Sequence, residues 1–206
     1  MTMIEIRTLH PEEAPIAADL HIEGQPGTVL TMLGKEFLTA LYREINDSAY
    51  GLAFVATSED KVVGIIAGAT DTGALFKDII LRRGIHLVWP VARRLLSKPA
   101  LLWRVIQTFA YPGKLPERPG DAEFLFIGVS GEMRRHGIAS QMLERLIAAC
   151  QERGARGLLS TVDVTNPRAN PFHVKRGFRI IDTFDLYGRK MNLYYLPFTD
   201  QPAGEG

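Results

Sequence analysis

The chain has 206 residues, enough for one domain with a substantial core, and its 46% apolar and 23% charged residues are ordinary for a globular protein. The formal net charge of +1 excludes a general polyanion binder, so no nucleic-acid partner is expected. The single cysteine, Cys150, excludes an internal disulfide and is expected in the core rather than as a nucleophile. No signal peptide and no apolar run near the roughly 20 residues of a transmembrane helix are recognised, so a cytoplasmic location is expected.

The first third of the chain predicts a strand, two helices and a hairpin. A short strand covers 4–7, and Pro11 followed by two acids marks the start of a helix. The inner face of that helix is expected to hold Ile16, Ala17, Leu20 and His21. A second amphipathic helix is predicted over 29–45, and a β-hairpin over 52–57 and 62–69. This order favours an α/β fold with a sheet of mixed direction.

Residues 71–120 differ in charge from the rest of the chain. They carry nine basic and three acidic side chains, a surplus of +6, whereas the remainder carries 15 basic and 20 acidic ones. Long apolar residues between the arginines predict two or three short amphipathic helices. The breaks are expected near Gly84, Pro90, Lys98–Pro99 and Tyr111–Gly113. Three interpretations stay open: a solvated basic face over a packed inner face, a basic wall or lid beside an active site, or a membrane-surface segment.

The stretch 123–140 carries most of the functional signal. The apolar run from Phe124 to Val129 predicts a buried strand, and a helical period begins at Ser140. A turn that opens a helix presents unpaired amides and the positive end of the helix dipole, and Gly137 has no Cβ to keep an anion away. One interpretation is a diphosphate-binding turn; the other is an ordinary strand–helix turn with exposed arginines.

The last third predicts a strand, a short helix and a hairpin. Asn166 is a plausible cap for the helix, and Pro167 suits its first position. The expected elements are a strand over 157–164, a helix from Asn166 to about Arg176, and paired strands over 178–186 and 189–196. Residues 1–198 are expected to form one domain, and the polar tail 199–206 to be disordered.

Two motifs, in this order of elements, resemble the GNAT superfamily of N-acetyltransferases. Arg134-x-x-Gly137-x-Ala139 follows a strand and resembles the family's acyl-coenzyme-A pyrophosphate loop. Asn166-x-x-Ala169-x-x-Phe172-His173-x-Lys175-x-Gly177-Phe178 resembles the family's second conserved helix. The resemblance covers 4–196 apart from 71–120. It implies the GNAT fold: a splayed, mixed central sheet flanked by helices, with a helical insertion between the third and fourth strands.

The resemblance implies acetyl-CoA as the acyl donor and assigns residues to it. Backbone groups of Ile127, Gly128 and Val129 would pair with the pantetheine arm, and the Val129 N–H would polarise the thioester carbonyl. The pyrophosphate would be held by the amides of Arg134, Arg135, His136, Gly137, Ile138, Ala139 and Ser140. Asn166 and Asn170 would contact the cofactor on the far side of the splayed strand pair.

The resemblance also places the acid and the base. Glu123 lies six residues before Val129, where the histone-acetylating branch carries its general base, and a protonated amine must lose a proton before it attacks. An exposed strand-start carboxylate is the alternative, with Asp163 and Glu132 as other candidate bases. His173 stands where the family usually has the tyrosine that protonates the leaving thiolate; it could act as the acid, only hydrogen-bond the sulfur, or face solvent. Other candidate phenols are Tyr187, Tyr194 and Tyr195.

The implied activity is transfer of the acetyl group of acetyl-CoA to a primary amine by direct attack in a ternary complex. No metal is expected, because no His, Cys and Asp cluster has ligand spacing. The positive charge of 71–120 favours an anionic small-molecule acceptor over a basic peptide. The alternatives are a non-catalytic acyl-CoA-binding sensor or interaction module and a protein or peptide acetyltransferase, and 71–120 could instead serve a homodimer or a membrane contact.

Overall fold

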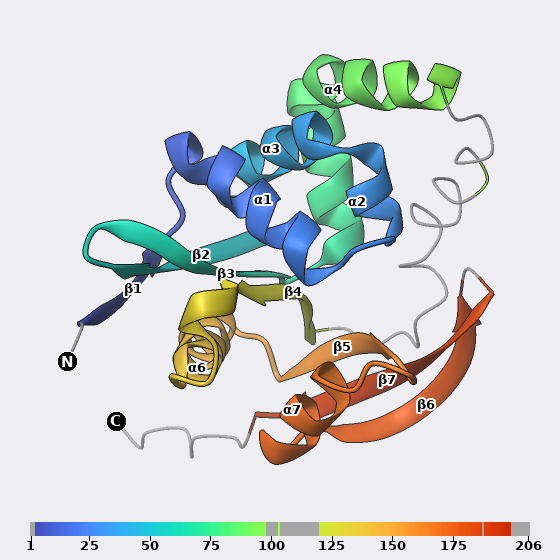
Figure 1. Cartoon of the computed structure of the whole chain (residues 1–206). Helices are drawn as coiled ribbons and strands as arrows, with labels where there is room; N and C mark the ends of the chain where they lie inside the picture. Colours follow the sequence, from blue (N-terminus) through green and yellow to red (C-terminus); the bar gives the residue numbers. More distant parts are fainter. Residues whose placement is uncertain (1–2, 98–102, 104–119, 187, 199–206) are drawn as a thin grey trace, which may run out of the picture.

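The computed structural model describes residues 3–97, 103, 120–186 and 188–198, and these form a seven-stranded sheet (Figure 1). The strands are β1 Ile4–Thr8, β2 Gly51–Ser58, β3 Lys61–Ala69, β4 Ala122–Val129, β5 Gly157–Asp163, β6 Arg179–Leu186 and β7 Arg189–Pro197. Their order is β1-β2-β3-β4-β5-β7-β6, and every neighbouring pair is antiparallel except β4 with β5. The predicted mixed sheet is therefore confirmed.

Helices cover both faces of this sheet. They are α1 Ala14–Gly24, α2 Val29–Leu33, α3 Lys35–Glu44, α4 Thr72–Ser97, α6 Ile138–Glu152 and α7 Ala169–Lys175, with short 3-10 helices η1 Pro11–Glu13, η2 Ile45–Asp47 and η4 Gly131–Met133. Figure 1 shows α1, α3 and α4 on one side of the sheet and α6 on the other. The sheet thus separates two apolar clusters, one on each face.

Adjacent strand residues alternate between these two clusters. In β3, Ile65 is buried in the cluster under α1 and α3, and Ile66 in the cluster under α6. Cys150 of α6 is buried in the second cluster, and burial raises the pKa of its thiol to about 12. A thiol this hard to ionise is a poor nucleophile, so the expected core role of Cys150 is confirmed.

The parallel neighbours β4 and β5 pair only at one end. The register contains two pairs, Ala122–Leu158 and Glu123–Leu159. Beyond Glu123, β4 continues to Val129 and β5 to Asp163 without further pairing between them. The splayed strand pair that the resemblance implies is therefore present.

Two expectations for the first helices are wrong. The single helix over 29–45 is two helices, because Gly34 between α2 and α3 has φ of 97°, a left-handed conformation that interrupts helical geometry and favours glycine. Ile16 of α1 is 44% exposed, whereas Ala17, Leu20 and His21 are buried as expected. The inner face of α1 is therefore narrower than its apolar pattern suggests.

The inserted segment also differs from its prediction. Between residues 72 and 97 it is one helix, α4, which continues through Gly84 and Pro90. Proline removes one amide donor and bends a helix, and Figure 1 shows two parts of α4 that run in different directions. Packing holds both parts against the core through Leu75, Ile79, Val91 and Leu95. The predicted breaks at Lys98–Pro99 and Tyr111–Gly113 and the tail 199–206 lie outside the described residues.

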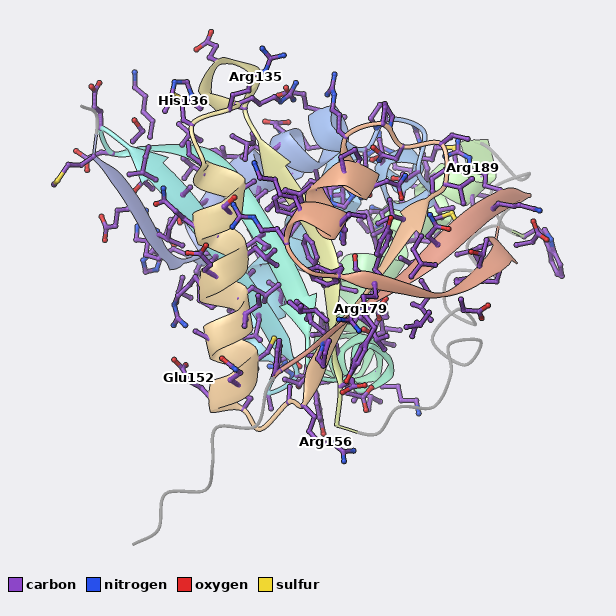
Figure 2. The ribbon with its side chains drawn as sticks, turned by 90° about the horizontal axis from the view of Figure 1, so that it is seen from below. Arg135, His136, Glu152, Arg156, Arg179 and Arg189 are labelled. Atoms are coloured by element: carbon purple, nitrogen blue, oxygen red, sulfur yellow. The ribbon has the colours of Figure 1, made fainter. Side chains whose placement is uncertain are left out.

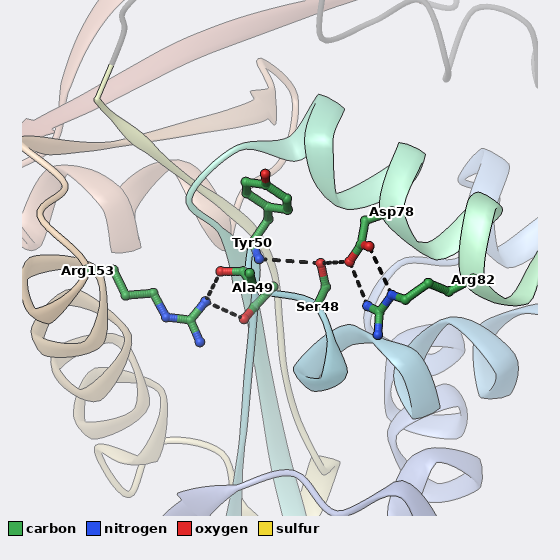
Figure 3. A network of polar contacts seen from close by, with 7 residues as sticks. Ser48, Ala49, Tyr50, Asp78, Arg82 and Arg153 are labelled. Atoms are coloured by element: carbon green, nitrogen blue, oxygen red, sulfur yellow. Dashed lines mark hydrogen bonds and ion pairs between the residues drawn. The ribbon is translucent and has the colours of Figure 1, made fainter.

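The short connection between η2 and β2 holds α4 on one side and the end of α6 on the other (Figure 3). Asp78 of α4 accepts hydrogen bonds from Ser48 at 2.5 Å and from Arg82 at 2.6 and 2.9 Å. These bonds, first that of Ser48 and then that of Arg82, hold the pKa of Asp78 below its ordinary value. Arg153, just after α6, donates to the carbonyl of Ala49 at 2.8 Å. Both helices are thereby fixed to the start of β2.

Candidate active site

A β-bulge bends β4 where it leaves β5. Ala67 of β3 is opposite Phe126 and Gly68 is opposite Phe124, so Leu125 is an extra residue in β4. As a result Leu125 and Phe126, although adjacent, both pack into the cluster under α1. The bulge changes the direction of the second half of β4, which borders the gap that opens as β5 diverges.

The backbone after the bulge lies directly beneath α1. A Cβ on Gly128 would come within 2.8 Å of the Phe126 ring and 3.1 Å of the Leu20 carbonyl oxygen, so a larger residue would not fit without movement. On its other side this segment pairs with β3, where Ile127 is opposite Ile66. Residues 127–129 thus lie on the diverging strand as predicted, and their contact with a pantetheine stays a prediction.

The turn before α6 has the geometry of an anion-binding helix start. Gly137 is the N-cap at φ of 77°, no side chain caps the helix, and a Cβ on Gly137 would meet no heavy atom within 4 Å. Arg135 is also left-handed, with φ of 69°. The turn therefore requires glycine at 137 for its backbone conformation, and it leaves the helix N-terminus accessible.

The basic side chains of the turn, Arg134, Arg135 and His136, have different surroundings. Arg134 donates to the Val129 carbonyl at 3.1 Å and to the Glu23 carboxylate at 2.6 Å, so its side chain ties the turn to the end of α1. Arg135 and His136 are exposed, and Figure 2 shows them on the turn at one end of α6. Arg134 therefore has a structural role that the sequence did not indicate.

Arg176 is a further cation at this site that the sequence analysis missed. It follows α7, and its guanidinium donates to the Ser140 hydroxyl in the first turn of α6 and to Glu144 at 3.4 Å. A cation near a helix N-terminus is unfavourable unless an anion lies nearby, and Glu144 is such an anion. The sequence signal that could have identified Arg176 is its position directly before Gly177 in the second motif.

The two predicted asparagines hold the chain around α7. Asn166 accepts hydrogen bonds from the amides of Arg168 and Ala169 at 3.0 and 2.9 Å, and α7 begins at Ala169 rather than at Pro167. Asn170 donates to the Asp163 carbonyl at 3.0 Å, and its side-chain oxygen accepts from Tyr194 and Asn192 at 2.9 and 3.2 Å. Both side chains therefore have internal partners, and their contacts with a cofactor stay predictions.

Glu123 lies at the point where β4 and β5 separate. It is 8% exposed, and its Oε2 accepts a hydrogen bond from the Thr72 hydroxyl at 2.5 Å. Thr72 is the first residue of α4 and is 7% exposed. The alternative of an exposed strand-start carboxylate is wrong, because α4 covers this end of β4.

His173 of α7 is a core residue. It is 3% exposed, its Nδ1 lies 2.8 Å from the Ala169 carbonyl, and its Nε2 lies 3.0 Å from the Ser160 hydroxyl. Because a carbonyl only accepts, Nδ1 carries the proton and Nε2 accepts from Ser160. Burial lowers the pKa of His173, which favours this neutral ring. The solvent-facing alternative is therefore wrong, and the acid role stays a prediction.

The other candidate acids and bases have different environments. Asp163 accepts hydrogen bonds from the amide and the hydroxyl of Thr165, and these bonds are the main reason that its pKa is held below its ordinary value. Glu132 is exposed in η4. Tyr194 is buried with its hydroxyl on Asn170, Tyr195 donates to Asp121 at 3.4 Å, and Tyr187 lies outside the described residues.

No group of three or more metal-ligating His, Cys, Asp or Glu side chains occurs among the residues that the structure describes. Within the same part of the chain, no helix is both long and apolar enough to cross a membrane.

A mixed sheet with one diverging parallel pair, and an uncapped glycine turn into the helix between those two strands, is the arrangement that the two motifs imply. The sequence matches the family model described as "Acetyltransferase (GNAT) family" over residues 29–178, well over half of the chain. The chain therefore belongs to the GNAT acetyltransferase family. A comparison with curated proteins found no match.

Solved structures show the same fold at low sequence identity. An acetyltransferase from Thermus thermophilus is 17% identical with a TM-score of 0.58, over 96% of this chain and 100% of that one. An N-acetyltransferase from Staphylococcus aureus is 19% identical with a TM-score of 0.59, over 95% and 99%. The PaiA N-acetyltransferase from Thermoplasma acidophilum, in complex with coenzyme A, is 14% identical with a TM-score of 0.58, over 95% and 99%. The GNAT fold implied by the two motifs is confirmed.

Proposed function

We propose that the chain transfers the acetyl group of acetyl-CoA to the primary amine of a small molecule by direct attack in a ternary complex. The observation that carries this proposal is the divergence of β4 and β5 beyond Glu123, next to a turn that opens α6 at Gly137 without a side-chain cap. The similar protein from Thermoplasma acidophilum is described with coenzyme A bound, which supports the same donor here.

In this proposal, successive parts of the strand–turn–helix unit bind successive parts of acetyl-CoA. The backbone of 127–129 pairs with the pantetheine, and the Val129 N–H polarises the thioester carbonyl. The amides of 134–140 bind the pyrophosphate, aided by the dipole of α6. Asn166 and Asn170 act mainly through the backbone that they hold in place, because their side chains are bonded internally.

Glu123 is the proposed base. The amine nitrogen forms a bond to the acetyl carbon, the carbon–sulfur bond breaks, the amine proton passes to the Glu123 carboxylate, and the thiolate leaves to take up one proton. The buried position of Glu123 at the strand divergence supports this role, because a carboxylate shielded from water takes up a proton more readily than an exposed one.

Glu123→Gln tests the base. Glutamine keeps the shape and can still accept from Thr72, but it cannot take up a proton. We expect kcat to fall by about 100-fold or more, with acetyl-CoA affinity unchanged. Release of the coenzyme A thiol, followed with a thiol reagent, measures the first quantity, and calorimetry the second. Wild-type turnover by the variant would move the base to another residue.

The thiolate that leaves must take up a proton. His173 keeps the assignment that its motif position implies, but its two ring nitrogens bond to Ala169 and Ser160. A donor role requires the Nδ1 proton to leave its bond to the Ala169 carbonyl, or the ring to carry a proton on Nε2, which accepts from Ser160 in the structure.

The acceptor is proposed to be a small, anionic amine. The basic surplus of 71–120 supports it, although Arg82, Arg93 and Arg94 already contact Asp78, Glu36 and the Met32 carbonyl. A panel of nucleotide-linked amino sugars, acidic amino acids, polyamines and basic peptides, assayed by coenzyme A release, tests the class. Reaction of polyamines or basic peptides alone would overturn it.

A second candidate function is an acyl-CoA-binding module without turnover. The specific observation in its favour is the buried, fully bonded His173 at the position of the family's usual tyrosine. Tight acetyl-CoA binding with no coenzyme A release on any amine of the panel would favour this candidate over the enzyme.

A further inference from the structure

We propose that Thr72 is a positioning residue for Glu123, so that the inserted helix α4 helps to set the base of the reaction. This inference rests on the proposed function, in which Glu123 accepts the amine proton. Thr72 belongs to neither motif of the chain and lies 51 residues before its partner in sequence. The insertion is therefore more than an addition to the surface of the fold.

The contact between the two side chains is direct and buried. Thr72 Oγ1 donates to Glu123 Oε2 at 2.5 Å, and the two residues are only 7% and 8% exposed. A hydroxyl that donates to a carboxylate in such a place fixes the carboxylate's orientation and favours its charged form. A base must be both charged and correctly aimed to receive a proton.

The start of α4 leaves the Thr72 hydroxyl available for this contact. Asp71 caps the helix, since its side chain accepts from the Ala74 amide at 2.8 Å and its carbonyl from the Leu75 amide at 2.9 Å. Thr72 follows the cap and does not need to serve it. The positive end of the helix dipole at this terminus adds to the stabilisation of the charged Glu123.

The rest of α4 keeps Thr72 in place. About two turns along the helix, Asp78 accepts from Ser48 and Arg82 (Figure 3). Further along, Arg94 donates to the Met32 carbonyl of α2 at 2.9 Å. The helix that carries Thr72 is thus anchored both to the start of β2 and to α2.

Other titratable and charged residues lie on the elements next to Glu123. Asp71 directly precedes α4, and Asp121 directly precedes β4. Glu123 is opposite Leu159 of β5, and Leu159 is opposite Tyr195 of β7. The Arg156 amide donates to the Gly120 carbonyl at 2.8 Å. These groups are unchanged in variants at position 72. A difference between such variants therefore reports the Thr72 hydroxyl alone.

The test is a pH titration of the Glu123 side chain by carbon-13 NMR of glutamate-labelled protein, with Glu123→Gln used to assign the signal. In Thr72→Val, which keeps the shape but removes the donor, we expect the titration midpoint to rise by about one pH unit. Thr72→Ser restores the donor and should restore the midpoint. Thr70→Val is the matched control, because Thr70 donates to the Tyr50 carbonyl instead, and its midpoint should equal that of the wild type. Equal midpoints in wild type and Thr72→Val would overturn the inference.

Activity and cofactor binding separate this inference from the proposed function. Thr72→Val should lose amine-dependent coenzyme A release most strongly at low pH, while its affinity for acetyl-CoA, measured by calorimetry, stays that of the wild type. If Glu123→Gln retains full turnover, the proposed base fails, whatever the titration shows. If Glu123→Gln is inactive and Thr72→Val matches the wild type at every pH, the positioning role alone fails.

Discussion

Glu123 and Phe124 are neighbours in β4, and their side chains point to opposite faces of the sheet. Glu123 meets Thr72 of α4, whereas Phe124 stacks on His173 of α7 with ring centroids 5.4 Å apart. The proposed base and the expected acid are therefore not brought to one face. In the proposed reaction the amine would approach the divergence of β4 and β5 from the α4 side, and His173 could reach the sulfur only from the other side.

His21 is a second buried histidine, and its surroundings give it a measurable effect on stability. Its ring stacks on Phe126 at 4.2 Å, and its Nδ1 lies 2.8 Å from the Tyr42 hydroxyl. Its Nε2 is buried and has no hydrogen-bond partner among the described residues. Burial lowers the pKa of His21 to about 4. The folded protein therefore holds this ring neutral over a pH range in which the unfolded chain protonates it.

We predict that this difference destabilises the protein in acid. Below the ordinary pKa of histidine, near 6.5, the unfolded chain binds the proton more readily, so the free energy of unfolding decreases as pH falls toward 4. Between pH 7 and pH 5, protonation of His21 in the unfolded chain should lower the free energy of unfolding by about 2 kcal/mol. Urea unfolding at the two pH values measures the loss in wild type and in His21→Phe, which should lose less. His136→Ala, a change at an exposed histidine, serves as control; an unchanged loss in His21→Phe would exclude His21 as the source.

At the scale of elements, the unit of β4, its turn and α6 joins the two faces of the sheet. Arg134 ties the turn to Glu23 of α1, and Arg176 ties the end of α7 to Ser140 of α6. The turn itself has the left-handed Gly137 and an uncapped helix start. Its neighbours fix its position, and its amides remain the part suited to an anion.

A charge placed on this turn should weaken acetyl-CoA binding. Gly137→Asp puts a carboxylate where the pyrophosphate is proposed to lie. Gly137→Asn is the matched control, because asparagine must adopt the same left-handed conformation, at φ of 77°, but carries no charge. We expect the dissociation constant of Gly137→Asp to exceed that of Gly137→Asn by about tenfold or more in calorimetric titrations at low salt. Equal constants for the two variants would place the pyrophosphate elsewhere.

For the whole molecule, the sequence predicted the features that depend on nearby residues. The hairpin of β2 and β3 follows from two apolar runs around Glu59-Asp60, and both residues have the positive φ of a tight turn. Gly137 and Gly177 mark a helix start and a helix end, and both are left-handed in the structure. Local patterns of this kind were sufficient to predict the order of strands and helices along the chain.

The features that the sequence did not predict depend on distant packing. α4 continues through Pro90 because both of its parts pack on the core, which a local pattern does not reveal. His173 is buried because Phe124 and Phe178 come from other elements to surround it. The Thr72–Glu123 bond joins the start of the insertion to the strand that follows it. The motifs therefore predicted which residues form the site, and only the fold gave the polar partners of those residues.

A crystal structure of the chain with coenzyme A bound tests the proposed donor site. We expect the pantetheine to lie between β4 and β5 along residues 127–129, with the pyrophosphate on the amides of 134–140 and the thiol beside Val129, on the side of the gap that faces Glu123. Coenzyme A bound anywhere else on the chain, or no complex at saturating coenzyme A, would contradict it.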